Sequence, residues 1–180
     1  MGLLIPTSGE ILVDGVAITQ TNRRAWQAHI SHVPQSIYLA DSTIQENIAF
    51  ATEPGKIKEY KVTQAAEQAQ ISETINNLRH KYLTSIGERG VQLSGGQRQR
   101  IGIARALYKD RDVFIFDEAT SALDNQTEQK IMEEIDQLKD NKTVFIVAHR
   151  ITTLKKCDRI IRINKDHTIE ILDYNQIGFD

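Results

Sequence analysis

Two short, uninterrupted apolar runs, residues 113–116 and 143–148, constrain the fold more than any other feature of this sequence. Runs of this length without alternation predict strands that are covered on both faces, as in parallel sheets. Between them, Ile131, Ile135 and Leu138 recur at helical spacing. A strand, a helix and a strand in that order predict an α/β fold with a parallel sheet.

Two further elements are expected beside these strands. Residues 30–33 predict a strand that stops at Pro34, because proline has no backbone N–H to donate to a sheet ladder. Residues 95–108 predict a helix with one apolar stripe, and Ser94 can cap the free N–H groups at its start.

The remaining segments predict hairpins and a helical lobe. Hairpins are expected over residues 10–18, where Asp14-Gly15 suits a tight turn, and over residues 159–172. Between residues 53 and 93 the composition changes, and the polar segments 61–70 and 71–80 predict short surface helices.

The composition suits one globular domain, because 40% of the 180 residues are apolar and 26% are charged. A net charge of −2 provides no excess of cations that would favour nucleic acid or an anionic membrane. The single cysteine, Cys157, cannot form an internal disulfide, so a reducing cytosolic setting is expected. No apolar run approaches the roughly 20 residues of a membrane-spanning helix, so any membrane association is expected to come through a partner or a further segment.

An acidic pair, Asp117-Glu118, directly follows the apolar run 113–116. Open α/β sheets bind their ligands at the carboxyl ends of the strands. In nucleotide hydrolysis, one carboxylate there can hold Mg²⁺ and its neighbour can polarise the attacking water. An acidic surface loop after a buried strand is the alternative.

A Ser-Gly-Gly triplet, residues 94–96, opens the helix predicted over residues 95–108. Glycines allow a phosphate to approach the backbone N–H groups closely, and the helix N-terminus carries a partial positive charge. The triplet is therefore a candidate phosphate-binding surface, and a flexible turn is the alternative.

Together, these stretches resemble the ATP-binding cassette (ABC) family in their order and spacing. The segments that carry the resemblance are HVPQ (residues 32–35, Q-loop), GERG (87–90, a segment typical of exporters), LSGGQRQRIGIARAL (93–107, which begins with the signature motif LSGGQ), VFIFDEATSALD (113–124, which contains the Walker B segment FIFDE and the D-loop SALD) and VAHR (147–150, which contains the switch histidine, His149).

The resemblance implies a P-loop NTPase (RecA-like) core with a parallel sheet, antiparallel hairpins and a small helical subdomain at about residues 41–110, all within one partial domain over residues 1–180. The family's phosphate loop, GxxxxGK[ST], occurs nowhere in this sequence. Family members carry it shortly before the segment that residues 2–9 resemble, so we expect an N-terminally truncated cassette. Such a chain is expected to be marginally stable and to hydrolyse ATP negligibly alone, because that loop positions the phosphates.

The resemblance also implies ATP and Mg²⁺ as cofactors and assigns roles at the sheet edge. Glu118 would be the general base that activates water, and His149 would contact the γ-phosphate. Asp117 and Gln35 would engage Mg²⁺ through water, and Gln35 would also sense a transmembrane partner.

A second set of roles concerns a head-to-tail dimer with ATP held between two cassettes. The residues that would bind the nucleotide of the opposing cassette are Ser94, Gly95, Gly96 and Gln97. Asp124 would lie in the dimer interface. The implied function is an ATPase of an ABC exporter, on the cytoplasmic face of a membrane and joined to a transmembrane domain at residues 44–50 and 87–90.

Two alternatives remain beside this function. One is a non-catalytic partner that donates its signature motif to a complete cassette. The other is a non-transport ABC ATPase, such as those of DNA maintenance or translation. Only 59 positions separate Gln35 from Ser94, so the domain is not interrupted by the long coiled coil of the chromosome-maintenance kind. Arg98, Arg100 and Arg105 predict a helix surface with ion pairs and no nucleic-acid site, because no aromatic residues are interleaved with them.

Overall fold

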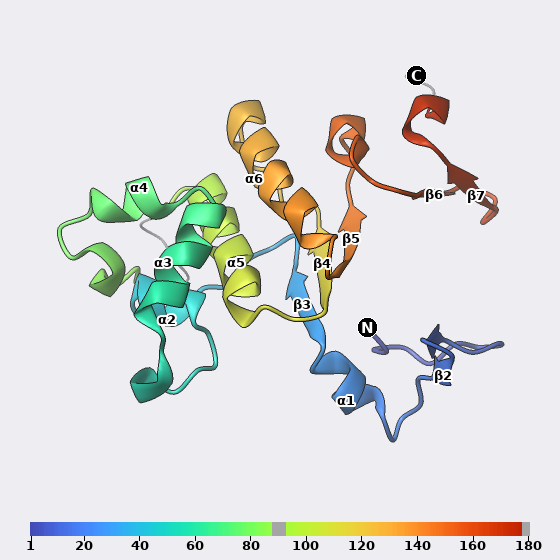
Figure 1. Cartoon of the computed structure of the whole chain (residues 1–180), viewed down its shortest axis with the longest axis horizontal. Coiled ribbons are helices and arrows are strands. Elements are labelled where there is room, and N and C mark those ends of the chain that lie inside the picture. Colours follow the sequence, from blue (N-terminus) through green and yellow to red (C-terminus); the bar gives the residue numbers. More distant parts are fainter. Residues whose placement is uncertain (88–92, 178–180) are drawn as a thin grey trace.

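A three-stranded parallel sheet organises the chain, in a computed structural model that describes residues 1–87 and 93–177 (Figure 1). Strand β4 (Val113–Asp117) lies between β3 (Ile30–Val33) and β5 (Thr143–Val147). Ile30 pairs with Val113, and Val113 pairs with Thr143. The predicted α/β class and the three predicted strands are therefore confirmed.

Helices α2–α5 gather at one end of the molecule, and α6 joins β4 to β5 (Figure 1). The predicted helix over residues 95–108 and the predicted helix between β4 and β5 are confirmed. Ser94 caps the first, and Asp124 caps the second. Two short helices, α1 and α2, are additional to the predictions. The α-helices are α1 (Arg23–Gln27), α2 (Ile44–Ile48), α3 (Glu59–Gln68), α4 (Ser72–Asn76), α5 (Gly95–Lys109) and α6 (Asn125–Leu138). The 3-10 turns are η1 (Pro54–Lys56), η2 (Lys81–Leu83), η4 (Ile151–Leu154) and η5 (Tyr174–Gln176).

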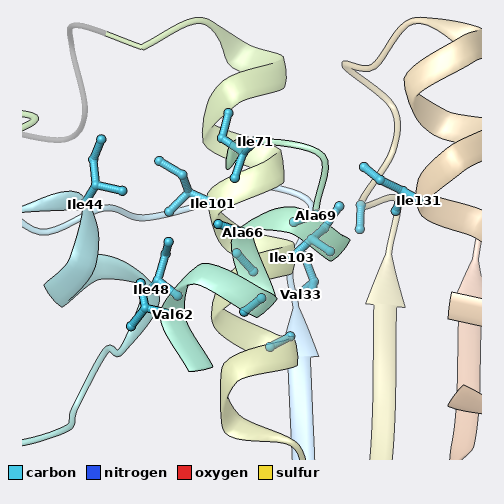
Figure 2. Close-up of a cluster of buried hydrophobic side chains, with 14 of the residues drawn as sticks. Val33, Ile44, Ile48, Val62, Ala66, Ala69, Ile71, Ile101, Ile103 and Ile131 are labelled. Atoms are coloured by element: carbon cyan, nitrogen blue, oxygen red, sulfur yellow. The ribbon is translucent and has the colours of Figure 1, made fainter. Parts of the chain in front are cut away.

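The main apolar core lies where α5 packs against α2, α3 and strand β3 (Figure 2). Ile48, Ala66 and Ile101 have no exposed surface there, and Val62 is 1% exposed. Buried isoleucine and alanine side chains fill this core, and those of α3 and α5 include Ala65, Ala66 and Ile101. The core thus joins residues 33–75 to the helix that begins with the Ser-Gly-Gly triplet.

Three arginines of α5 bond differently from the prediction. Ion pairs were expected, but Arg98 donates to the backbone carbonyl of Leu93 and Arg100 to that of Gln70. Arg105 donates to the carbonyls of Asn47 and Tyr38, each at 2.9 Å. These side chains satisfy carbonyls at the ends of short helices and in loops, where the backbone has no regular partner.

Two antiparallel hairpins lie at the other end of the molecule (Figure 1). The first pairs β1 (Leu12–Val13) with β2 (Val16–Ala17), and the second pairs β6 (Ile160–Ile163) with β7 (Ile169–Leu172). Both predicted hairpins are confirmed. Asp14 and Gly15 have φ values of 49° and 78°, the left-handed conformation that the first tight turn requires.

Strand β5 departs from the prediction that both of its faces are covered. Thr143, Phe145 and Val147 are exposed, and Phe145 keeps 54% of its surface accessible. The strand lies at the edge of the three-stranded sheet, and the alternate residues Val144 and Ile146 pack against the core. A continuous apolar run in the sequence therefore does not show which face of the strand is buried by other elements.

Candidate active site

Glu118 occupies the loop that leaves the central strand β4 at its carboxyl end. Its backbone has a φ of 48°, a left-handed conformation that is uncommon for a non-glycine residue. Its N–H donates to the carbonyl of Val147, at the end of β5, at 2.9 Å. This bond extends the ladder by one residue and ties the acidic loop to the neighbouring strand.

The carboxylate of Glu118 lies between two side chains from the loops on either side. Gln35, which follows β3, donates from Nε2 to Oε2 of Glu118 at 2.8 Å. Nε2 of His149, which follows β5, lies 2.8 Å from Oε1 of Glu118. The Glu118 side chain is 19% exposed and that of His149 is 85% exposed. The structure thus brings three predicted residues into direct contact, and Asp117 is half-buried beside them at the end of β4.

The start of α5 is closed by a reciprocal capping box. The hydroxyl of Ser94 accepts from the N–H of Gln97 at 3.2 Å, and the Gln97 side chain accepts from the N–H of Ser94 at 2.9 Å. The first N–H groups of a helix have no intrahelical partner. In this box the N–H groups of Ser94 and Gln97 donate to side chains, so the N–H groups of Gly95 and Gly96 are available to other acceptors.

Packing also favours a glycine at position 96. A Cβ at this position would lie 3.0 Å from the carbonyl oxygen of Ala122 and 3.4 Å from Cδ2 of Leu123. The loop after β4 therefore lies directly against the start of α5. A side chain at residue 96 would require this loop to shift by a few tenths of an ångström.

A surface hollow of about 530 Å³ lies between these two segments. The predicted residues Ser94, Gly95, Gly96 and Asp124 line it, together with Arg100. Asp124 caps α6 by accepting from the N–H of Thr127 at 2.9 Å. Hydrogen bonds from Thr127 lower the pKa of the Asp124 carboxyl, so it is ionised at neutral pH.

The predicted residues therefore form two groups. Gln35, Asp117, Glu118 and His149 lie at the carboxyl edge of the sheet, whereas Ser94, Gly95, Gly96 and Asp124 line the hollow. Gln97 is not among the lining residues, and its side chain is bonded to Ser94 in the capping box.

Gln99 is a buried residue of this region that the sequence reasoning missed. Its Nε2 donates to the Ser121 hydroxyl at 3.0 Å, and its Oε1 accepts from the N–H of Ala122 at 2.9 Å. It is 5% exposed. The signal was present, because Gln99 shares the buried stripe of α5 with Ile103 and Ala106, four and seven residues later.

Glu128 was missed in the same way. It lies three and seven residues before Ile131 and Ile135 on the buried stripe of α6, and it is 6% exposed. A charged residue on an apolar stripe needs buried partners. Here those partners are Thr120, Arg150 and Thr153.

Comparison with known proteins decides the family. The sequence model of the ABC transporter family matches residues 1–121 of this chain. The chain belongs to the ABC transporter family. Beyond the match, this ABC chain continues through α6, β5 and the second hairpin.

Similar proteins include several membrane exporters. The chain is 41% identical over 175 residues to the Beta-(1-->2)glucan export ATP-binding/permease protein NdvA of Rhizobium etli. This match covers 97% of this chain and 29% of that protein. It is 43% identical over 163 residues to the ATP-dependent lipid A-core flippase of Vibrio cholerae, and this match covers 91% of this chain and 28% of that protein. This ABC chain thus spans less than a third of the length of these curated relatives.

A solved structure supports the fold independently. The structure of a bacterial Atm1-family ABC exporter with ATP bound matches with a TM-score of 0.82 and 38% identity, over 87% of this chain and 27% of that chain. The α/β fold with helices and hairpins around a parallel sheet is therefore that of an ABC exporter's cassette. Within the described residues, none of the helices has the length and apolar character needed to cross a bilayer.

Proposed function

We propose that this chain forms part of the ATP-hydrolysing cassette of an ABC exporter, with Glu118 as the general base. The observation that carries the proposal is the contact of the Glu118 carboxylate with Gln35 on one oxygen and His149 on the other. The similarity to exporters along nearly the whole chain supports the same function.

Glu118 and His149 have the properties that hydrolysis needs. The carboxylate is mostly buried yet reaches the sheet edge, so it can accept a proton from water there. The imidazole of His149 is 85% exposed, and its contact with Glu118 can be exchanged for a phosphate oxygen without repacking the core. We infer that this exchange releases one Glu118 oxygen toward the water.

Gln35 and Asp117 fit a site for Mg²⁺ that is held mainly by a nucleotide. Nε2 of Gln35 donates to Glu118, so its carbonyl oxygen is the atom available to a cation or its water. The carboxylate of Asp117 lies half-buried at the strand end. In the described residues no cluster of three or more acidic, His or Cys groups could hold a metal by itself. Mg²⁺ commonly takes only one or two protein carboxylates besides phosphates and water, and it would neutralise phosphate charge.

The hollow beside α5 supports a role in binding the nucleotide of a second cassette. Gly95 and Gly96 retain N–H groups at the positive end of a 15-residue helix, and Ser94 lines the same hollow. Gln97 is bonded to Ser94 in the capping box beside it. Asp124 lies on the opposite wall and would face the second cassette.

The partner and location follow from the exporter assignment. We infer a transmembrane domain that docks on the helical subdomain, about residues 41–110, near α2; this places the cassette at the cytoplasmic face of the membrane. Residue 87 of the predicted GERG contact is described, whereas residues 88–90 lie outside the described residues.

A chimeric exporter tests the catalytic proposal. In the chimera, residues 1–180 of this chain replace the matching segment of the ATP-dependent lipid A-core flippase of Vibrio cholerae, and the rest of that protein is kept. ATP hydrolysis is expected in the chimera, and Glu118→Gln is expected to reduce kcat by about 100-fold or more, because general-base catalysis contributes on the order of 10²–10⁴. Glu133→Gln, an exposed α6 residue bonded to Gln129, serves as the control. A Glu118→Gln chimera as active as this control would refute the assignment.

A second candidate function is favoured by the completeness of the signature surface, whose lining residues belong to α5 and the loop before α6. In this role the chain donates that surface to a complete cassette. Residues 1–180 alone are expected to hydrolyse no ATP, since the sequence contains no GxxxxGK[ST]. Added to a complete cassette whose own signature serine is replaced, the chain would restore hydrolysis, and Gly95→Asp would abolish the rescue. No rescue by the unmodified chain would exclude this role.

A further inference from the structure

Glu128 is a buried carboxylate that the proposed mechanism does not use. Its residue surface is 6% exposed, and it lies on the first turns of α6. The hydroxyls of Thr120 and Thr153 donate to Oε1 at 2.9 and 2.7 Å. Nη1 of Arg150 donates to Oε2 at 2.6 Å. Both carboxylate oxygens are therefore occupied.

The partners of Glu128 flank the two proposed catalytic side chains. Thr120 lies two residues after Glu118, in the loop that leaves β4. Arg150 directly follows His149, and Thr153 lies in the 3-10 turn after it. Arg150 also donates to the carbonyl of Leu123 at 3.4 Å, which adds a second link between the same segments. One carboxylate thus anchors both segments to α6.

The charge state of Glu128 suits a permanent anchor. Burial by itself raises the pKa of the carboxyl, but hydrogen bonds from Thr153, Arg150 and Thr120 outweigh it and the pKa is lowered. Glu128 therefore stays ionised and accepts from all three donors at neutral pH. Arginine does not lose its proton in proteins, so the pair persists over the working range.

Stability alone does not account for this arrangement. Buried ion pairs often stabilise a protein no more than apolar residues of the same volume would, because the charges lose their hydration. The hydrogen bonds of a buried ion pair do, however, fix the distance between the groups that they join. Glu128 lies between the segments that carry Glu118 and His149, so its bonds can fix the distance between those two residues.

We propose that Glu128 is a positioning residue that holds Glu118 and His149 in register for hydrolysis, by anchoring residues 118–124 and 149–153 to α6. This inference rests on the proposed catalytic roles of Glu118 and His149. A displacement of about 1 Å at a reacting group can reduce a rate by on the order of 100-fold.

The chimera defined above also tests this proposal. Glu128→Gln keeps the shape and an acceptor oxygen but removes the charge that pairs with Arg150. We expect kcat to fall by about 10-fold to 100-fold while KM for ATP changes by less than about 3-fold, because the variant misplaces groups without altering nucleotide contacts. Amide hydrogen exchange is expected to accelerate in residues 118–122 and 149–153, with α3 and α5 unchanged.

Controls separate the possible failures. Glu133→Gln on the same helix is expected to leave both measurements unchanged, and Thr153→Val, which removes one donor, is expected to lower kcat by about 3-fold to 10-fold even if Glu128→Gln fails to fold. A chimera that hydrolyses no ATP with Glu128 intact would overturn the proposed function. Variants that match the Glu133→Gln control in kcat, or that accelerate exchange equally in α3 and α5, would overturn the positioning role alone.

Discussion

Helices α2, α3 and α5 enclose an apolar core, whereas the loops after β4 and β5 are tied to α6 by buried polar groups. In the first region Ile101 and Ile103 have no exposed surface. Beside the second region, apolar side chains of β5 and of the β6–β7 hairpin are exposed: Phe145 at 54%, Ile163 at 72% and Ile171 at 67%. The helical region is thus stabilised mainly by apolar burial, whereas the loops after β4 and β5 add buried polar hydrogen bonds to the apolar contacts of Ala119 and Leu123.

This difference matters because the two kinds of interaction respond to different changes. Apolar burial depends on volume and is insensitive to pH, whereas charged hydrogen bonds depend on geometry and ionisation. The proposed catalytic residues lie in the second region. Their alignment is therefore expected to be lost before the helical core unfolds.

The largest effect is expected from Ile103→Ala. Removing a side chain with no exposed surface should lower the free energy of unfolding by about 2–5 kcal/mol, because lost burial and a residual cavity add. Ile163→Ala, at a position that is 72% exposed, should change it by less than about 0.5 kcal/mol. Urea unfolding of both variants measures the contrast, and equal losses would contradict it.

A smaller effect, dependent on pH, is expected for Glu128→Gln. The pKa of Glu128 is lowered from 4.5 by its hydrogen bonds, so its stabilisation is present above that pH and is lost as the pH falls through the lowered value. The variant should be less stable than the parent by about 2 kcal/mol at pH 7, and the difference should shrink in acid. Urea unfolding from pH 7 to pH 3 measures it; a difference that is independent of pH would count against the ionised network.

Gln99→Met should have a still smaller effect. It removes the acceptor for the N–H of Ala122 and the donor to Ser121, at a cost of about 1 kcal/mol. Hydrogen exchange at Ala122 should accelerate while α3 stays protected. Gln129→Met, at an exposed position on α6, is the matched control and should leave both unchanged.

The smallest effect is expected from Glu53→Gln, which removes an ion pair with Lys56 whose side chains are 74% and 73% exposed. Exposed pairs contribute about 0–1 kcal/mol, so the free energy of unfolding should change by less than about 0.5 kcal/mol. A loss comparable to that of Glu128→Gln would show that burial does not separate the two kinds of pair.

Local patterns predicted most of the regular elements. The expected strand over residues 30–33 and the helix from residue 95 appear at those positions, because proline ends a strand and serine caps a helix through neighbouring atoms. The short helices α1 and α2 were not predicted. Each has only five residues, which is too short for a helical period to be recognised.

The sequence predicted which residues belong to the candidate site, from their type and order. It did not predict the contacts among them. Motif spacing singled out Gln35, Glu118 and His149, but the resemblance assigned no role to Gln99 or Glu128, and both were missed. Their burial depends on which face of α5 and α6 meets the loop after β4.

The sequence by itself determined the three strands of the sheet, the helices α5 and α6 between them, the cap of α5 and the membership of the family, because periodicity, capping and motif spacing are read within short windows. Only the tertiary structure decided that Gln35 and Glu118, 83 residues apart, share a hydrogen bond, and that one face of β5 stays exposed. Those outcomes depend on which segments meet in space, and that is decided by the packing of the whole chain.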